Sequence, residues 1–135
     1  MKSKIVVDTN IIISAFLFSG LPNKLFKEII DEKHHLFLSH DILNELLHVL
    51  SREKFKLSES QIKQFYEELI NITNIVYPQK KLRIVNEDPS DDMLFECAIE
   101  ANAQFIITGN KHVLKLKKYK NIQVISAKEF MILFR

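Results

Sequence analysis

The sequence predicts a three-layer α/β domain with a central parallel β-sheet. Two short runs of β-branched and aromatic residues, 5–7 and 105–107, contain no polar side chain, which is typical of strands buried on both faces. Between such runs lie segments with apolar residues at helical spacing. Strands that alternate with helices need crossover connections, and these connections place helices on the faces of a parallel sheet.

The first half of the chain predicts two strands and four helices. Gly20 and Pro22 end the first helix, Ser39 is the expected N-cap of the third, and Ser58 with Gln61 has the form of a capping box for the fourth. The expected elements are a strand at 5–7, helices at 10–18 and 21–31, a strand at 35–38, and helices at 42–50 and 58–70.

In the second half of the chain the predicted strands and helices are less regular at first, and the alternation of strands with helices then resumes. Residues 71–87 have strand-like pieces at 75–77 and 82–85. The sequence Asp88-Pro89-Ser90 is expected to cap a helix, and a second capping box at Ser126 and Glu129 opens the terminal helix. The other expected elements are a helix at 91–102, a strand at 104–107, a short helix ending near 116, and a strand at 121–125.

Composition places the chain among ordinary globular proteins. Its 135 residues are 47% apolar and 27% charged, which suits a single domain over 1–135 and excludes wholesale disorder. No apolar run approaches the roughly 20 residues of a membrane span, and an acid at position 8 argues against a signal peptide. Cys97 is the only cysteine, which excludes an intrachain disulfide and a cysteine-rich zinc site and favours a reducing, cytoplasmic location.

The basic residues are unevenly distributed along the chain. The formal net charge is only +2, but no acid lies between Glu100 and Glu129. The lysines of this stretch include Lys111, Lys115, Lys117, Lys118, Lys120 and Lys128. They form either a solvated face or a surface for a polyanion, to which lysines give salt-dependent, sequence-independent affinity.

Polar residues follow the buried strands, at the edge where open α/β sheets bind their ligands. Asp8 follows the strand at 5–7, and Thr108 and Asn110 follow the strand at 105–107. If these two strands are neighbours, four oxygen-bearing side chains from distant parts of the chain face one cleft. They are Asp8, Glu45, Asp92 and Asn110, with Asp91 beside Asp92.

Each member of this set also has a purely structural explanation. Asp8 and Asn110 are good helix caps, and acids at 91 and 92 are favoured at a helix N-terminus by the helix dipole. Glu45 has His48 three residues away as a local partner. As a set, however, carboxylates without thiols or paired histidines suit hard cations such as Mg²⁺ or Mn²⁺. The five histidines show no metal-binding spacing.

The chain resembles the PIN domain family, and within it the VapC-like toxins of toxin–antitoxin systems. The motifs that carry the resemblance occur in the family's order over nearly the whole chain. They are Asp8-Thr9-Asn10 after the first strand, Glu45 in its helix, the 88–92 segment, and Thr108-Gly109-Asn110 after a late strand.

The resemblance implies a ribonuclease that depends on Mg²⁺ or Mn²⁺. Asp8 and Glu45 match the first two metal-binding acids, and Asp92 best matches the third, with Asp91 the close rival. Thr9, Asn10 and Thr108 match polar positions that orient ligands, water or phosphate. The family's fourth position usually carries Asp, and this chain has Asn110, so one strong metal and at most a weak second one are expected. An amide brings no negative charge, so activity is expected to be reduced.

The expected reaction is attack of an ion-activated water on an RNA phosphorus. Asp8 and Asp92 would hold the main cation, Glu45 would complete its shell, and lysines 111, 115, 117 and 118 would contact the RNA backbone. The resemblance further implies an antitoxin protein as partner, and exposed apolar residues on helices within 21–70 could support a homodimer or that partner.

Two other functions compete with this one. The chain could be a PIN-fold module that binds RNA or protein after losing catalysis through Asn110. It could also be a phosphotransfer domain, which likewise places an Asp after the first strand. Asn10 disfavours the haloacid-dehalogenase pattern of Asp-x-Asp, and the Asp that a receiver domain carries on its third strand is missing.

Overall fold

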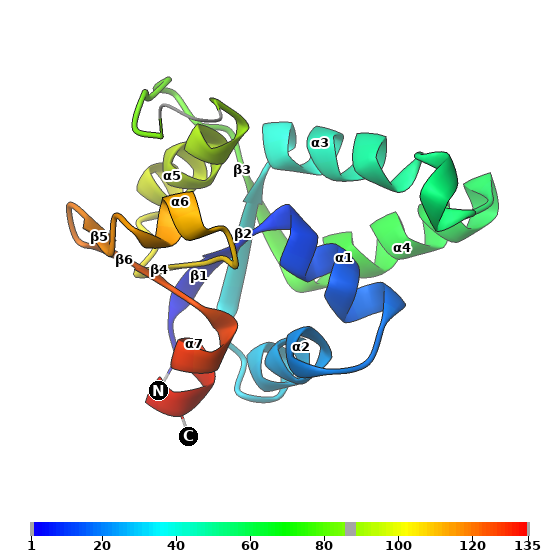
Figure 1. Ribbon diagram of the computed structural model, residues 1–135, viewed down its shortest axis with the longest axis horizontal. Coiled ribbons are helices and arrows are strands. Elements are labelled where there is room, and N and C mark those ends of the chain that lie inside the picture. Colours follow the sequence, from blue (N-terminus) through cyan, green and yellow to red (C-terminus); the bar gives the residue numbers. More distant parts are fainter. Residues whose placement is uncertain (1, 86–88, 135) are drawn as a thin grey trace.

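Six strands form one sheet in the order β3-β2-β1-β4-β6-β5 in a computed structural model that describes residues 2–85 and 89–134 (Figure 1). Neighbouring strands pair in parallel, except β5 and β6, which are antiparallel. The predicted parallel sheet is confirmed, with one antiparallel strand added at an edge. The strands are β1 (Lys4–Val7), β2 (His35–Ser39), β3 (Thr73–Val76), β4 (Phe105–Ile107), β5 (Lys118–Tyr119) and β6 (Ile122–Ile125).

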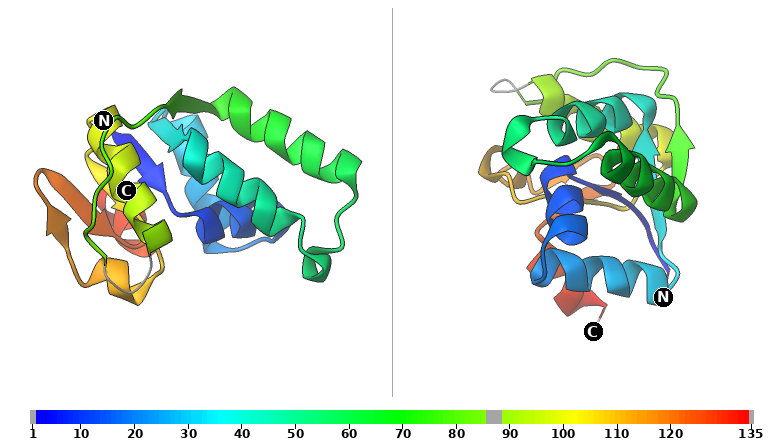
Figure 2. Two further views of the ribbon diagram at one scale, coloured as in Figure 1. Left: turned by 90° about the horizontal axis from the view of Figure 1, so that it is seen from above. Right: turned by 90° about the vertical axis from the view of Figure 1, so that its right-hand side faces the viewer.

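Helices cover both faces of this sheet, as the predicted three-layer architecture requires. Figure 1 shows α1 to α4 on one side of the strands and α5 on the other, and both views of Figure 2 keep α3 and α4 side by side. The helices are α1 (Thr9–Leu17), α2 (Leu21–Asp31), α3 (His40–Leu50), the 3-10 turn η1 (Glu53–Phe55), α4 (Glu59–Ile72), α5 (Pro89–Ala101), α6 (Lys111–Leu114) and α7 (Ala127–Leu133).

Local sequence signals fix where several helices begin. Ser39 Oγ accepts a hydrogen bond from the Ile42 backbone N–H at 3.1 Å, which caps α3 as expected. Reciprocal capping boxes open α4 at Ser58 and α7 at Ser126, also as expected. Pro89 opens α5, and Asp88, part of the expected cap, lies outside the described residues.

Two strand assignments differ from the sequence-based expectation. Residues 82–85 belong to no strand and instead run along α5 as part of a connecting segment, 77–85, that we call the strap. In the strap, carboxylates of α5 accept the backbone N–H groups that a neighbouring strand would otherwise pair. The antiparallel strand β5 was not expected, because its two residues lie within a lysine-rich stretch without a strand-like pattern.

The central strands are buried completely. Ile5, Val6 and Val7 are 0% exposed, and so are Ile106 and Ile107 of the neighbouring β4. Burial of such side chains supplies most of the stabilisation, roughly 1.5–3 kcal/mol for each. Among the described residues, no helix combines the length and apolarity needed to cross a membrane.

The strand order reverses direction between β1 and β4. From β1 the chain adds β2 and then β3 on one side, whereas β4 and β6 lie on the other side. In open α/β sheets such a reversal leaves a crevice beyond the carboxyl ends of the two strands. Asp8 directly follows β1, and Thr108 directly follows β4, so the fold brings these two residues to the crevice.

Candidate active site

A cleft of about 120 Å³ lies at the reversal point between β1 and β4. Four segments that are distant in the sequence contribute its walls: the end of β1, the helix α3, the start of α5 and the turn after β4. The lining residues are Asp8, Thr9, Asn10, Ile42, Glu45, Val49, Ser90, Asp91, Leu94 and Asn110. Three carboxylates therefore border one small volume.

Asp8 is held on both of its oxygens. Oδ1 accepts the Asn10 backbone N–H at 2.8 Å and thereby caps α1. Oδ2 accepts the Thr108 hydroxyl at 2.7 Å, and the Asp8 backbone N–H donates to the Ile107 carbonyl at 2.9 Å. Because Asp8 is only 8% exposed, these bonds compensate much of the cost of burying its charge. Asp8 therefore both caps α1 and lines the cleft.

Thr108 and Asn110 organise the turn after β4. Thr108 is completely buried, and its Oγ1 accepts the Asn110 backbone N–H at 3.1 Å while it donates to Asp8. The Asn110 side chain uses both of its ends. Oδ1 accepts the His112 backbone N–H at 2.8 Å, which caps α6, and Nδ2 donates to Asp91 Oδ2 at 3.2 Å.

Asp91, and not Asp92, faces the cleft. Ser90, Asp91 and Leu94 line it, whereas Asp92 lies on another face of α5, where Oδ1 accepts the backbone N–H groups of Ile84 at 2.9 Å and Val85 at 2.7 Å. One residue along an α-helix turns the side chain by about 100°, so adjacent acids cannot point the same way. The structure thus places Asp92, the sequence-based choice for the third acid, outside the cleft and its rival inside.

Glu45 approaches the cleft from α3. It lies on the same helix face as Ile42 and Val49, three residues before and four after it, and all three line the cleft. Glu45 is half-buried, whereas His48, the local partner considered from the sequence, is exposed. Ser90 also lines the cleft, whereas the sequence predicts it only as part of a helix cap, although it lies directly before Asp91 in the 88–92 motif.

The donor set of the cleft fits a hard divalent cation. Its polar lining offers carboxylate, amide and hydroxyl oxygens, with no thiol or imidazole. Within 2–85 and 89–134, no three His, Cys, Asp or Glu side chains stand close enough to share one metal ion, so joint ligation requires side-chain rotation toward the cleft centre.

Burial raises the pKa of the Cys97 thiol to about 12, which leaves it without thiolate character near neutral pH.

The lysines predicted to contact RNA lie at different distances from the cleft. Lys111 follows Asn110 in the first turn of α6 and is exposed. Lys115, Lys117 and Lys118 are also exposed but lead away from the cleft into β5. Lys120 lies by the opposite end of β4, where it borders a hollow together with Gln104. Of this stretch, Lys111 is adjacent in sequence to a cleft residue.

A doubly wound sheet with an acid-lined cleft at its reversal point defines a class of α/β proteins that bind ligands at the carboxyl ends of their strands. A sequence model of the PIN domain matches residues 4–112. The chain therefore belongs to the PIN domain family.

Individual relatives are consistent with this membership. The uncharacterized protein MJ1680 of Methanocaldococcus jannaschii is 31% identical over 135 residues, which covers 95% of this chain and 86% of that protein. Two solved structures share the fold with a TM-score of 0.64 each. They are VapBC2 from Rickettsia felis bound to a DNA fragment from its promoter, at 18% identity over 91% of this chain and 98% of that one, and VapBC-1 from nontypeable Haemophilus influenzae, at 20% identity over 93% and 98%.

Proposed function

We propose that this protein is a divalent-metal-dependent ribonuclease that acts as the toxin of a toxin–antitoxin pair. The observation that carries the proposal is that Asp8, Glu45 and Asp91, from three distant segments, border one cleft at the sheet reversal. Three carboxylates around so small a volume repel one another unless a cation joins them. PIN domains are typically nucleases, which is consistent with such a site.

In this mechanism Asp8, Glu45 and Asp91 would hold a divalent ion, Mg²⁺ or Mn²⁺. When bound, the ion would supply charge stabilisation for the phosphodiester and lower the pKa of a water. Asp8 is the most constrained of the three, because Thr108 and the Asn10 backbone fix its carboxylate plane. Glu45 or Asp91 would accept the proton of the attacking water, and Thr9 and Asn10, which line the cleft, would orient the substrate.

Metal binding and cleavage are tested separately. Calorimetric titration with Mn²⁺ is expected to show binding to the wild-type protein and none to Asp8→Asn, which retains a helix cap. Single-stranded RNA should be cut in the presence of Mn²⁺ and left intact with EDTA. Cleavage that survives Asp8→Asn would come from a contaminant, and Mn²⁺ binding that survives this substitution would refute the proposed site.

One observation favours a second function, that of a PIN-fold module that binds RNA or protein without cutting it. Asn110 brings no charge to the cleft and presents an N–H group to Asp91. RNA binding by the wild-type protein without any cleavage in Mn²⁺, measured on structured and unstructured RNA, would support this module and contradict the nuclease.

An antitoxin is the proposed partner. Two structural neighbours are VapBC complexes, and the chain leaves large apolar side chains exposed, among them Phe18 at 62% and Ile30 at 51%. Exposed apolar groups of this size favour protein contacts, including a homodimer. The test is inhibition of RNA cleavage by the co-expressed antitoxin, with the oligomeric state measured by light scattering.

A further inference from the structure

The turn after β4 connects two acids of the cleft. Thr108 Oγ1 donates to Asp8 Oδ2 at 2.7 Å, the Asn110 backbone N–H donates to Thr108 Oγ1 at 3.1 Å, and Asn110 Nδ2 donates to Asp91 Oδ2 at 3.2 Å. A continuous chain of hydrogen bonds therefore runs from Asp8 to Asp91 through this turn. Asp8 directly follows β1 and Asp91 lies in α5, so the sequence separates the two carboxylates by more than eighty residues.

The orientation of the Asn110 amide is fixed from both ends. Its oxygen accepts the His112 backbone N–H at 2.8 Å, and its nitrogen donates to Asp91. Turning the amide over would place a donor against the His112 N–H and an oxygen against a carboxylate, so both contacts would become repulsive. The oxygen that could bind a cation is thus used to cap α6, and the group next to Asp91 is a hydrogen-bond donor.

From this geometry we propose that Asn110 is a positioning residue that orients Asp91, and that it restricts the cleft to one tightly bound divalent ion. The proposal rests on the metal-dependent function proposed above and assigns the role of one residue within it. A donor on Asp91 Oδ2 restricts rotation of the carboxylate plane. A second cation beside Asn110 would meet an N–H group instead of an oxygen.

Substitutions at position 110 separate charge from positioning. Ser and Asp both cap helices well, so α6 is retained in Asn110→Ser and Asn110→Asp. Asn110→Ser removes the Nδ2 donor without adding charge, and is expected to keep one Mn²⁺ site and weaken it about 10-fold, the lower range for loss of a hydrogen bond to a metal ligand. Asn110→Asp adds a carboxylate beside Asp91, and is expected to raise the stoichiometry to two.

The experiment is calorimetric titration of each protein with Mn²⁺ in the absence of RNA, with electron paramagnetic resonance to detect coupled Mn²⁺ pairs. Asn44→Asp, which adds the same charge at an exposed position one residue before Glu45, is the control and is expected to bind one ion. Two ions in the wild-type protein, unchanged affinity in Asn110→Ser, or one ion in Asn110→Asp would each overturn this inference and leave the nuclease proposal intact. No Mn²⁺ binding to the wild-type protein would overturn the nuclease proposal itself.

Discussion

At the scale of single residues, the adjacent acids Asp91 and Asp92 have different environments. Both are buried, at 9% and 6% exposure, but Asp91 borders the cleft and accepts a hydrogen bond from Asn110 Nδ2, whereas Asp92 accepts the backbone N–H groups of Ile84 and Val85. A buried carboxylate that accepts two backbone N–H groups leaves both unsatisfied when it is removed. Asp92 therefore stabilises the fold, while Asp91 belongs to the cleft.

The matched pair Asp91→Ala and Asp92→Ala tests this division. Asp92→Ala removes the acceptor of both N–H groups and is expected to lower the free energy of unfolding by about 1–3 kcal/mol, as measured by urea denaturation. Asp91→Ala is expected to weaken Mn²⁺ binding by at least about 10-fold. The opposite pattern, with Mn²⁺ affinity lost at position 92 and kept at 91, would show that the sequence-based choice of Asp92 was right.

His34 couples the stability of the fold to pH. Its Nδ1 accepts the Ser3 backbone N–H at 3.0 Å, and Phe130 and Phe134 pack edge-on against its ring. Burial lowers the pKa of His34 below 6.5, against the opposing effect of Glu32. Protonation would also turn Nδ1 from an acceptor into a donor that faces another N–H.

A lowered folded-state pKa means that the unfolded chain binds the proton more readily. The contribution of His34 is therefore present above about pH 6.5 and is lost as the pH falls through its folded-state value. Urea midpoints measured at about pH 7.5 and pH 5 should differ less for His34→Gln than for the wild-type protein. His35→Gln, at an exposed neighbour, serves as control and should keep the wild-type difference.

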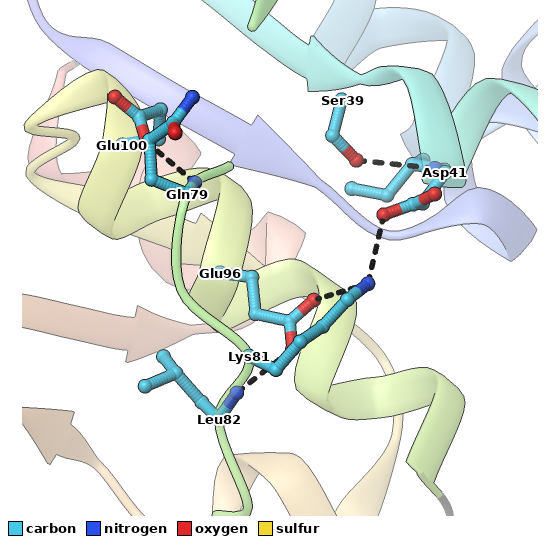
Figure 3. Close-up of polar contacts among 8 residues, drawn as sticks. Ser39, Asp41, Gln79, Lys81, Leu82, Glu96 and Glu100 are labelled. Carbon is cyan, nitrogen blue, oxygen red and sulfur yellow. Dashed lines mark hydrogen bonds and ion pairs between the residues drawn. The ribbon is translucent and has the colours of Figure 1, made fainter. Parts of the chain in front are cut away.

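At the scale of secondary structure, α5 presents a row of acids to the strap. Asp92, Glu96 and Glu100 are four residues apart on one helix face, and each accepts a backbone N–H group of the strap. Glu96 accepts the Leu82 N–H at 2.9 Å, and Glu100 accepts the Gln79 N–H at 2.9 Å (Figure 3). Lys81 Nζ also lies 3.4 Å from Asp41 of α3 and 3.9 Å from Glu96. Carboxylates thus replace the strand partner that the 82–85 pattern predicts.

The row of acids, more than the ion pairs of Lys81, should hold the strap. Lys81 is 81% exposed, and exposed ion pairs contribute about 0–1 kcal/mol. Glu96 is 5% exposed, so Glu96→Ala should leave the Leu82 amide unsatisfied and speed its hydrogen exchange, at a cost of about 1–3 kcal/mol. Lys81→Ala should leave that exchange rate nearly unchanged. If Glu96→Ala and Lys81→Ala changed the exchange rate of the Leu82 amide equally, the ion pairs of Lys81 would be the main contact that holds the strap.

At the scale of the whole molecule, the sequence was sufficient for the fold class and for most elements, because apolar periodicity and helix caps are local signals. It also placed the cleft beyond the ends of β1 and β4, since Asp8 and Thr108 directly follow these neighbouring buried strands. It favoured Asp92 over Asp91 as the third acid, whereas Asp91 lines the cleft, because that choice depends on how α5 is rotated against the sheet. The direction of the Asn110 amide likewise depends on contacts with His112 and Asp91 that come from tertiary structure.

The distribution of lysines over the molecule leads to a final prediction about RNA affinity. Lys111 opens α6 directly after a cleft residue, whereas Lys120 lies by the opposite end of β4. If RNA lies across the cleft, Lys111 contacts its backbone and Lys120 does not. Each phosphate contact to a single strand contributes about 0.7 to the slope of log affinity against log salt concentration. Lys111→Gln should therefore weaken binding of single-stranded RNA and reduce this slope by about 0.7.

Lys120→Gln is the control for Lys111→Gln. Both substitutions remove one positive charge from an exposed position, so a difference between them cannot come from net charge alone. Fluorescence anisotropy with labelled single-stranded RNA, in EDTA to prevent cleavage, gives the affinity at several salt concentrations. Lys120→Gln should retain the wild-type slope. An equal loss in both variants would indicate that RNA is held by the diffuse positive charge of the lysine-rich stretch, and not along a path through the cleft.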